Sequence, residues 1–545
     1  MKYTASLFVA FFILLALPTL VHAGDVEYAR VVERSDSEVL IKRNTLTTET
    51  WFMCQLGSLA CVETPSTTHI TSSAGTPAYM QAYRALLPSG ASSLSRSPDG
   101  RYIAFYIPAT ESRGARTFGV MDTTSLSIFT KKLTISYWDL LTEGVRYYSF
   151  SPDSKSLIYI DDSKNNPTLY QVNLEKLTAS ELTSSKMFSR EYSVADVVWK
   201  DENTIFFIAN RDGTYAWALY EYSLKTSTLT KIADNVSYAD NLWMMGTNLL
   251  FTYADELGVR PALYDTTTKS IRTFALPTTG ALPIKGKAVK LAGALTGTFF
   301  LESSRNSDTL LVWLHGGPYR QASVGYHPYF SYGGYDWVME KARLLNIGVL
   351  KIDYPGSAGR GRLFAESITK QVGVKDATET AAAVADFAKR NRYTKVYLMG
   401  NSYGGYLAMK MLVDKPGSYR GVMSIGGVAD WTTMLTALDT SIFNKQFGGT
   451  VGDANANYKL YNDASIYNRV ERLSGQKFIL IHADNDMTIP YRQSEGLASY
   501  LTSLGKSNSL ITMAGEDHVF KKPESFELLC QSVLGLVDRT STCDL

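Results

Sequence analysis

The sequence has little net charge and few cysteines or histidines for its length. Among 545 residues, 54 lysines and arginines nearly balance 52 aspartates and glutamates, which leaves a formal net charge of +2. Such a balance gives no indication of nucleic acid or of an anionic membrane as a partner. A hydrophobic content of 45% is that of a globular protein, and the length predicts two or three domains.

Long apolar runs are also missing, except at the N-terminus. Lys2 precedes an apolar stretch over residues 7–21, which contains Pro18 and leads into His22-Ala23. A basic start, a short apolar core and small residues after it are typical of a cleaved export signal. The run is short for a membrane span, so a retained anchor is the weaker alternative. We expect cleavage after Ala23, a periplasmic or secreted protein, and no stable membrane association afterwards.

The four cysteines fall into two pairs that are close in sequence. Cys54 and Cys61 flank a short loop, and Cys530 and Cys543 lie near the C-terminus. An even number of cysteines in an oxidising compartment indicates two local disulfides. Four cysteines allow three connectivities, and two reduced pairs are the alternative.

Residues 24–285 read as short strands with turn signals and almost no helix. A turn followed by an apolar strand recurs at intervals of roughly 40–50 residues, the spacing of propeller blades. The turns are Ser97-Pro98-Asp99-Gly100, Ser151-Pro152-Asp153-Ser154, Lys200-Asp201-Glu202-Asn203 and Met245-Gly246-Thr247-Asn248. Four blades are visible, and residues 38–41 hint at another. The pattern predicts an all-β propeller-like domain without a catalytic or metal-binding cluster, and an all-β sandwich is the alternative.

Residues 286–545 alternate apolar strands with helical segments, after a loose linker over residues 276–293. Near-continuous apolar strands indicate a mostly parallel, doubly wound sheet that is covered on both faces. The strands are expected at residues 310–314, 347–352, 396–399, 422–425, 478–481 and 510–512. Ligands and chemistry belong at the carboxyl ends of such strands.

One of these strand ends carries the sequence Gly400-Asn401-Ser402-Tyr403-Gly404. A strand that turns sharply into a helix needs glycines beside the serine, because the backbone is crowded there. The turn lifts the Ser402 hydroxyl clear of the sheet, near the positive end of the helix dipole. Ser402 is therefore the candidate nucleophile.

Two later strand ends supply an acid and a base in the order of α/β-hydrolases. The sequence has six histidines, and only His518 follows every candidate acid. Asp484 and Asp486 both follow one strand, while Asp517 is adjacent to His518 and cannot easily turn back onto its ring. The acid must hold the imidazole in the right tautomer and stabilise the imidazolium. The residues alone leave Asp484 and Asp486 open.

The first apolar strand of this half ends in His315-Gly316-Gly317-Pro318. Glycines there allow backbone N–H groups to approach an oxyanion. The second donor is expected to be the N–H of Tyr403, directly after the nucleophile.

These motifs together resemble the prolyl oligopeptidase family of serine peptidases, in its acylaminoacyl-peptidase and dipeptidyl-peptidase branches. The resemblance covers the C-terminal half by motif and the N-terminal half by architecture. It implies Ser402, Asp486 and His518 as the catalytic residues, with Asp486 preferred because Asp486-x-x-Ile489-Pro490 matches the family acid. It implies Gly317 and Tyr403 as oxyanion donors, and a peptidase without metal or cofactor.

The resemblance also implies the walls of the pocket for the residue before the scissile bond. These are Tyr403, Val428, Trp431 and Met434, an uncharged set that favours an apolar residue. Two motifs depart from the family: its Tyr-Arg-Gly-Ser is Tyr354-Pro355-Gly356-Ser357 here, and its His-Gly is His482-Ala483. The chain also lacks the double-glutamate motif that anchors a substrate amino terminus in dipeptidyl peptidases.

We therefore expect an exported serine peptidase that acts on short peptides. An esterase with the same triad and a non-catalytic propeller binding protein are the alternatives.

Overall fold

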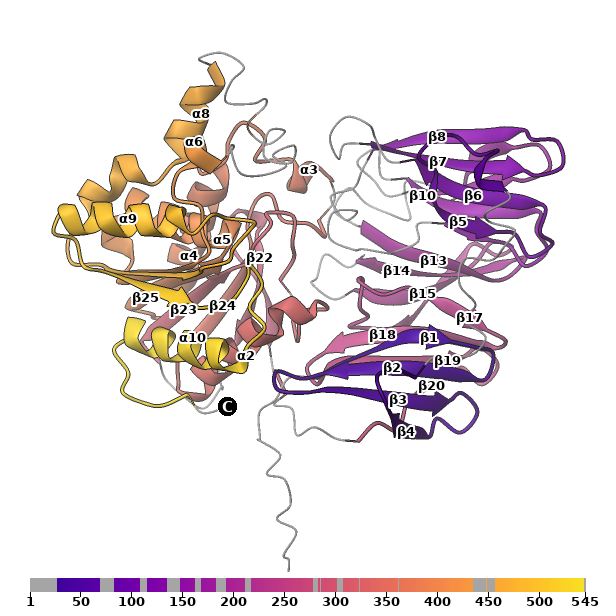
Figure 1. Cartoon of the computed structure of the whole chain (residues 1–545), viewed down its shortest axis with the longest axis horizontal. Helices are drawn as coiled ribbons and strands as arrows, with labels where there is room; N and C mark the ends of the chain where they lie inside the picture. Colours follow the sequence, from indigo (N-terminus) through magenta and orange to yellow (C-terminus); the bar gives the residue numbers. More distant parts are fainter. Residues whose placement is uncertain are drawn as a thin grey trace, which may run out of the picture.

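The structure is a computed structural model of the whole chain, and it describes most of it. The described residues are 27–68, 83–107, 115–134, 148–161, 168–182, 193–210, 217–277, 283–284, 286–300, 307–322, 324–360, 362–434, 447 and 456–543. The predicted export signal lies outside them. Figure 1 shows two halves, a set of β-sheets from the first half of the chain beside a helix-covered sheet from the second.

The described residues of the N-terminal half form five four-stranded units. Their strands are β1 (Tyr28–Arg34), β2 (Glu38–Asn44), β3 (Glu49–Gln55) and β4 (Cys61–Thr64); β5 (Ser92–Arg96), β6 (Tyr102–Ile107), β7 (Ala115–Asp122) and β8 (Ile128–Thr134); β9 (Tyr148–Phe150), β10 (Ser156–Asp161), β11 (Thr168–Asn173) and β12 (Thr178–Glu181); β13 (Ser193–Asp201), β14 (Thr204–Asn210), β15 (Ala218–Ser223) and β16 (Thr228–Ala233); and β17 (Trp243–Met245), β18 (Asn248–Asp255), β19 (Gly258–Asp265) and β20 (Ser270–Thr273). Neighbouring strands within each unit are antiparallel. This arrangement is propeller-like, as the repeats predict.

The turns of the repeat explain why the sequence forms these units. In the turn before β6, the Gly100 N–H donates to Ser97 O at 2.9 Å and the Ser97 hydroxyl donates to Asp99 at 2.6 Å. The equivalent turn before β10 has the same hydroxyl bond, from Ser151 to Asp153 at 2.7 Å. A serine that bonds an aspartate two residues later stabilises a tight turn between strands.

The first unit, β1–β4, is the one that the repeats indicate only through residues 38–41. Its opening hairpin turns over Ser35–Glu38 without the Pro-Asp pair of the turns before β6 and β10, so the sequence shows four blades where the described residues form five. β1 pairs in parallel with β19, at Tyr28 and Val259, and joins the first and last units into one eight-stranded sheet. The first described strand is thereby fixed to the last unit of this half.

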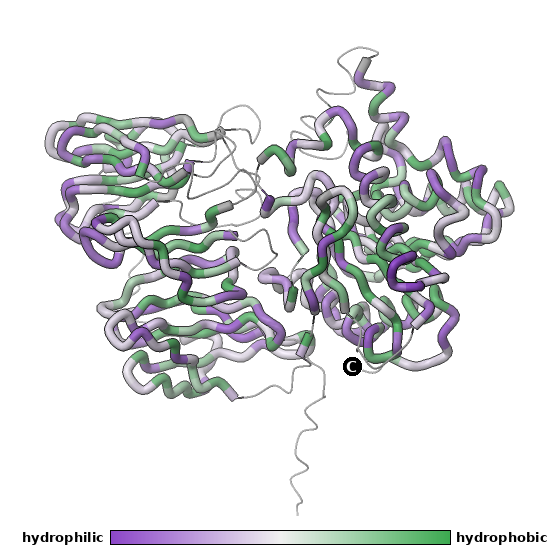
Figure 2. Tube along the Cα trace, turned by 180° about the vertical axis from the view of Figure 1, so that it is seen from behind, coloured by the Kyte–Doolittle hydropathy of each residue, from purple (hydrophilic) through white to green (hydrophobic). Residues whose placement is uncertain are grey.

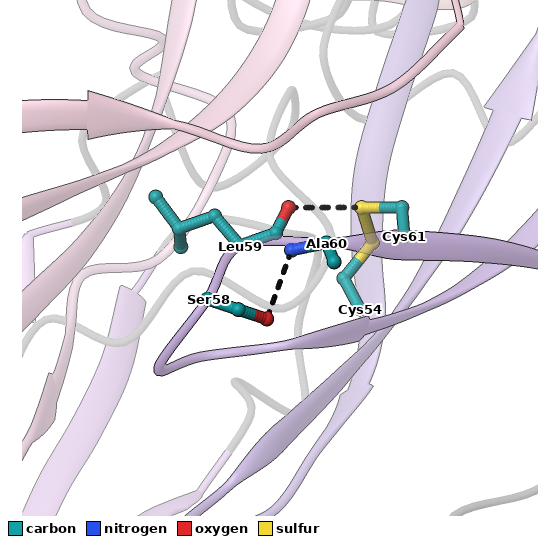
Figure 3. Close-up of a disulfide and its surroundings, with 5 residues drawn as sticks. All are labelled: Cys54, Ser58, Leu59, Ala60 and Cys61. Atoms are coloured by element: carbon teal, nitrogen blue, oxygen red, sulfur yellow. Dashed lines mark hydrogen bonds between the residues drawn. A yellow bond between two sulfur atoms is a disulfide. The ribbon is translucent and has the colours of Figure 1, made fainter.

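Both disulfides that the sequence predicts are present. Cys54 and Cys61 face each other on the antiparallel strands β3 and β4. Figure 3 shows the short loop that the bridge closes, where the Ala60 N–H donates to the Ser58 hydroxyl at 3.3 Å. Cys530 in the last helix is bridged to Cys543. Each bridge closes a short loop and lowers the conformational entropy of the unfolded chain.

The C-terminal half contains one eight-stranded sheet in the order β21-β22-β24-β23-β25-β26-β27-β28. The strands are β21 (Lys287–Lys290), β22 (Thr296–Phe300), β23 (Thr309–Leu314), β24 (Gly348–Asp353), β25 (Lys395–Asn401), β26 (Gly421–Ile425), β27 (Lys477–Ala483) and β28 (Asn508–Met513). The last six in this order are parallel, as predicted. β21 and β22 are antiparallel and extend one edge.

The edge strand β21 lies inside the segment that the sequence reads as a linker. Its sequence, Lys-Ala-Val-Lys, is mostly exposed and lacks a hydrophobic pattern. An edge strand that carries lysines needs no buried face, which is why the sequence does not reveal it. The predicted domain limits, 24–285 and 286–545, stay a prediction.

Helices cover both faces of this sheet (Figure 1). They are α2 (Gly333–Leu344), α3 (Arg362–Ala365), α4 (Lys375–Arg390), α5 (Tyr403–Asp414), α6 (Trp431–Met434), α8 (Ala456–Ala464), α9 (Arg492–Ser503) and α10 (Pro523–Leu536), with short 3₁₀ turns η2 (Ala292–Ala294), η3 (Phe330–Tyr332), η4 (Pro416–Ser418) and η5 (Tyr467–Arg472). None of the helices within the described ranges is long and apolar enough to cross a membrane.

The two apolar layers of this half follow from the alternation of side chains along a strand. In β23, Leu310, Val312 and Leu314 belong to the core cluster on one face, whereas Leu311 and Trp313 belong to the cluster on the other. All five are fully buried. Figure 2 shows the same distribution, with hydrophobic residues along the central strands and hydrophilic residues on the outer segments.

The two halves touch through a specific set of hydrogen bonds. Across the interface run Tyr28 Oη to His327 O (2.8 Å), Asn210 Nδ2 to Gly359 O (3.0 Å), Trp217 Nε1 to Gln321 Oε1 (2.8 Å) and the Tyr326 N–H to Asp255 O (3.0 Å). On the C-terminal side, three of these four hydrogen bonds involve the loop between β23 and α2, at Gln321, Tyr326 and His327. That loop also carries the glycines next to Ser402, so the first half of the chain contacts the wall of the candidate site.

Candidate active site

Ser402 lies at the turn between β25 and α5, in a strained backbone conformation. Its φ of 54° and ψ of −124° are unusual for a residue other than glycine. The flanking glycines are required by space: a Cβ on Gly404 would lie 2.0 Å from Leu314 O, and one on Gly400 would lie 2.4 Å from the backbone of Gly404. The close approach of α5 to β25 and β23 therefore allows no side chain at either glycine.

The backbone around Ser402 is held on both sides. Its N–H donates to Ile425 O on β26 at 2.7 Å, and its carbonyl accepts the Tyr406 N–H of α5 at 3.0 Å. The strain at this residue is sustained by the sheet and the helix together, which leaves the side chain at the carboxyl edge of the strands.

The glycine loop after β23 packs directly against the nucleophile. A Cβ on Gly316 would lie 3.1 Å from the Ser402 Cβ, and Gly317 has a φ of 128°, which glycine tolerates best. The buried His315 is held by its own contacts, Nδ1 to Gly316 O at 2.8 Å and Nε2 to the Ser357 hydroxyl at 2.9 Å. His315 thus shapes the loop, and its ring is not available to Ser402.

Tyr332 supports this loop, and sequence reasoning missed it. Its hydroxyl accepts the Gly316 N–H at 3.1 Å, and burial raises the pKa of the phenol, so the hydroxyl stays neutral. Tyr332 comes from η3 and has no motif around it. Only the fold brings it to the glycine loop.

Asp486 and His518 meet at the ends of neighbouring strands β27 and β28. His518 Nδ1 lies 2.7 Å from Asp486 Oδ2. Asp486 Oδ1 accepts the N–H groups of Thr488 and Ile489 at 2.8 and 2.7 Å. Burial alone would raise the pKa of Asp486, but hydrogen bonds from His482 and His518 outweigh it and hold this pKa well below its usual range. The carboxylate is therefore ionised and its orientation is fixed.

The other candidate acids are engaged elsewhere. Asp484 Oδ1 accepts the Gly515 N–H at 2.7 Å, and Asp517 Oδ1 accepts the backbone N–H of His518 at 2.6 Å. Neither carboxylate is hydrogen bonded to the His518 ring in the part of the chain that the structure describes. The geometry thus pairs the imidazole with Asp486.

His482 sits behind this pair. Its Nδ1 lies 2.7 Å from the Ser494 hydroxyl, and its Nε2 lies 2.8 Å from Ile489 O and 3.3 Å from Asp486 Oδ2. The ring is fully buried. It braces the loop of the carboxylate and does not reach the cavity.

A cavity of about 250 Å³ opens beside Ser402 and His518. Three of the expected catalytic and oxyanion residues face it: Ser402, His518 and Gly317. The remaining lining residues are Gly316, Tyr319, Arg320, Ser331, Tyr332, Tyr335, Asn401, Thr488, Ile489 and Val519. A substrate in this cavity would lie between the serine hydroxyl and the imidazole.

The four residues expected to form the apolar pocket belong to one core cluster, to which α5 and α6 contribute. Tyr403, Val428, Trp431 and Met434 are each at most 1% exposed. The rings of Tyr403 and Trp431 have centroids 6.1 Å apart. These four residues do not line the 250 Å³ cavity, and residues 435–446, which follow α6, lie outside the described ranges.

Tyr403 has a buried partner that the sequence does not reveal. Its hydroxyl donates to Asp376 Oδ2 at 2.6 Å, in the first turn of α4. Burial raises the pKa of Asp376 to about 6 despite this bond. The backbone N–H expected to act as an oxyanion donor thus belongs to a residue whose side chain is fixed by a carboxyl group.

No group of three or more histidine, cysteine, aspartate or glutamate side chains within the described ranges could hold a metal ion.

Comparisons with known proteins agree with this fold. The chain matches the prolyl oligopeptidase family over residues 334–541. It is 24% identical to dipeptidyl aminopeptidase BIII of Pseudoxanthomonas mexicana over 223 residues, which are 40% of this chain and 31% of that protein. It is 23% identical to dipeptidyl peptidase 4 of Sus scrofa over 184 residues, 33% of this chain and 23% of that protein. These matches span less than a third of each relative's length.

Solved structures resemble the chain over both halves. A puromycin-hydrolyzing peptidase of Mycobacterium tuberculosis has a TM-score of 0.63 at 16% identity, and the match covers 94% of each chain. An acylaminoacyl peptidase of Pyrococcus horikoshii has a TM-score of 0.55 at 14% identity, and the match covers 93% of this chain and 95% of that one. At such low identity the likeness shows the fold, a propeller followed by an α/β-hydrolase domain. Residues 334–541, which hold Ser402, Asp486 and His518, are a domain of the prolyl oligopeptidase family of serine peptidases.

Proposed function

We propose that this chain is a serine peptidase that hydrolyses short peptides with Ser402 as nucleophile, His518 as base and Asp486 as the acid that orients it. The observation that carries the proposal is the 2.7 Å contact between His518 Nδ1 and Asp486 Oδ2, with Ser402 and His518 on the same cavity. A carboxylate at Nδ1 leaves Nε2 as the proton acceptor that the reaction requires.

In the proposed reaction, Ser402 Oγ attacks the scissile carbonyl carbon while its proton passes to His518 Nε2. The imidazolium is stabilised by the ionised Asp486. Charge develops on the carbonyl oxygen, toward the N–H groups of Gly317 and Tyr403. Collapse breaks the C–N bond, and His518 gives its proton to the leaving amine. Water then attacks the acyl-enzyme by the same steps and restores the Ser402 hydroxyl.

The pocket for the residue before the scissile bond is proposed to be apolar. Tyr403, Val428, Trp431 and Met434 carry no charge, and a charged substrate residue among them would lose its hydration without a partner. An alanine, a proline or a larger apolar residue is therefore favoured at this position.

Labelling with a fluorophosphonate tests the proposal. We expect one label per chain, on Ser402, and none on the Ser402→Ala variant. Hydrolysis of an aminoacyl anilide and of an aryl ester with the same acyl group then separates peptidase from esterase. Absence of labelling on folded protein would argue for a binding protein, and hydrolysis of the ester alone would argue for an esterase.

Export to an oxidising compartment is proposed as well. Two disulfides in a chain with no free cysteine among the described residues fit such a compartment. Expression in the natural cell with N-terminal sequencing of the mature protein would test this. A chain found in the cytosol that still begins at Met1 would contradict it.

A further inference from the structure

Arg320 lies in the wall of the cavity, next to the oxyanion loop. A Cβ on Gly317 would lie 3.3 Å from the Arg320 Cγ, so the stem of the arginine passes along this glycine. Its backbone is fixed, because its N–H donates to Pro318 O at 2.8 Å and its carbonyl accepts the Ala358 N–H at 3.0 Å. The guanidinium stacks on Tyr329, with Cζ 4.5 Å from the ring centroid. Tyr329 packs in turn on Tyr238 of the N-terminal half.

This arginine has no carboxylate partner among the residues that the structure describes. The ionisable side chains that act on it are Tyr238, Tyr329 and Tyr332, which are neutral at ordinary pH. The described residues that line the cavity include no aspartate or glutamate either. Arg260 and Arg343 differ from it, since each of them faces a carboxylate at 2.6 Å. A half-buried arginine in the wall of a cavity, without a carboxylate partner among the described residues, is suited to an anionic group of a ligand.

Two features favour the leaving-group side of the scissile bond as the place of this cavity. His518 must protonate the leaving amine, and both His518 and Val519 line the cavity. The four residues expected to hold the acyl side do not line it. The part of a peptide that follows the scissile bond therefore extends past His518 and the tyrosines toward Arg320.

We propose that Arg320 binds the C-terminal carboxylate of the substrate, so that the enzyme releases one or two residues from a free peptide C-terminus. The inference rests on the proposed peptidase function and names its substrate class. The volume of about 250 Å³ lies just below the range for drug-sized ligands, which fits a leaving group of one or two residues. The planar guanidinium can donate two parallel hydrogen bonds to a carboxylate, and the tyrosines around it reduce the competition from water.

Paired substrates test this without any change to the protein. All substrates share one acyl part that ends in an apolar residue. The leaving group is one, two or four alanines long, and at each length the two members of a pair are the free acid and the C-terminal amide. For one or two alanines we expect kcat/KM to be about 10–100-fold higher for the acid, the value of a charge-assisted hydrogen bond. For four alanines the ratio should approach one. Equal rates for acid and amide at every length would overturn the inference.

Variants then assign the effect to Arg320. In Arg320→Gln the ratio of acid to amide should fall toward one, and Arg320→Lys should keep part of it because the charge remains. Arg360 is a matched control, since it also stacks on an aromatic ring, Phe364 at 4.0 Å, but does not line the cavity. Arg360→Gln should keep the full ratio. A full ratio in Arg320→Gln would show that another group binds the carboxylate. Because the readout is the ratio of acid to amide within one variant, a general loss of activity does not affect it. If Arg320→Gln does not fold, the wild-type substrate pairs still test the inference.

The same assay separates the two proposals. If amides and acids are cleaved at equal rates, the peptidase function stands and the carboxylate site fails. If neither is cleaved and Ser402 is not labelled by a fluorophosphonate, the peptidase function itself fails.

Discussion

Asp486 and Asp484 are two residues apart and follow the same strand, yet their surroundings differ completely. Asp486 is 7% exposed and bonded to His518, whereas Asp484 is exposed and bonded to a loop N–H. Asp486→Asn should lower kcat by about 10⁴-fold, since the amide supports the wrong imidazole tautomer. Asp484→Asn should change it little. Steady-state kinetics on one anilide substrate measures both, with thermal unfolding to verify the fold. The reverse order of effects would make Asp484 the acid.

Ser402→Ala and His518→Ala should each lower kcat by about 10⁶-fold, and the double variant should be no worse than either single one, because the residues act as a unit. The same anilide assay reports this. A double variant much less active than each single variant would mean that the two side chains act independently.

Asp376 should make the stability of the protein depend on pH in an unusual direction. Its pKa is about 6 in the folded state and 3.8 in the unfolded chain. Between these values the folded state holds a proton that the unfolded state has lost, so stability falls as pH rises from about 4 to 6 and is constant above. The loss is about 3 kcal/mol by the usual conversion of two pKa units.

Asp376→Asn removes this titration while its amide oxygen can still accept the Tyr403 hydroxyl. The midpoint of thermal unfolding of Asp376→Asn minus that of wild type should therefore be larger at pH 8 than at pH 4.5. Asp376→Ala, which leaves the hydroxyl without its acceptor, should be less stable at both pH values. A constant difference between Asp376→Asn and wild type would show that this carboxyl does not titrate between them.

Sequence reasoning reaches some residues of the site and not others, for a physical reason. The serine, the glycines and the final histidine belong to short motifs in which each residue is required by local backbone geometry or chain order. Tyr332, Arg320 and Asp376 have no such local signal. They reach the site because the loop before α2 and the first turn of α4 contact residues that follow β23 and β25, which depends on tertiary structure alone.

At the scale of elements, the apolar strands were predictable and the exposed ones were not. β23 to β27 are mostly buried and therefore read as apolar runs, whereas the edge strand β28 is only partly buried and is marked by Leu510 and Ile511. β21 is exposed and mostly polar, and β4 has one exposed valine and two polar residues. Edge strands are stabilised by backbone pairing more than by side-chain burial, so the sequence carries little trace of them. The unit β1–β4 is only hinted at by residues 38–41, because its opening turn lacks the turn residues of the repeat.

The short helix α6 gives a prediction at this scale. Trp431 is fully buried. Its backbone N–H donates to the Ser465 hydroxyl at 2.9 Å, which fixes the start of the helix. If α6 forms a wall of the apolar pocket, Trp431→Ala should shift preference toward larger apolar residues before the scissile bond, by about 10-fold in relative kcat/KM for a change of one or two methylenes.

A panel of anilides that differ only in this residue measures the shift. Tyr461 is a control of similar burial in the same cluster, whose ring stacks on Phe447 with centroids 3.9 Å apart. Tyr461→Ala should lose stability without a change of preference. Unchanged selectivity in Trp431→Ala would mean that this tryptophan only fills the core.

At the scale of the whole molecule, the propeller-like half is fixed to the loop that carries the oxyanion glycines. Gly325 illustrates how close the halves lie: a Cβ there would be 2.3 Å from Asp255 O in β18. The buried bond from Trp217 to Gln321 and the edge-to-face contact of Tyr238 with Tyr329 both involve residues next to Arg320. The N-terminal half therefore borders the cavity side of the peptidase domain and can restrict access to it.

Exclusion by size is the function we predict for this arrangement. The apolar pocket gives little selectivity on its own, because one methylene is worth only about 1–3 kcal/mol. A flexible peptide can pass a gap between the halves or enter when they open, whereas a folded protein cannot.

We expect short peptides to be cleaved and casein, a long unfolded chain, to be spared under the same conditions. Trp217→Phe, which keeps an aromatic ring but loses the bond to Gln321, should loosen the interface and raise the rate on casein relative to a short peptide. Mass spectrometry of the products follows both substrates in one mixture. Comparable cleavage of casein and peptide by the wild-type protein would show that the propeller-like half is no gate.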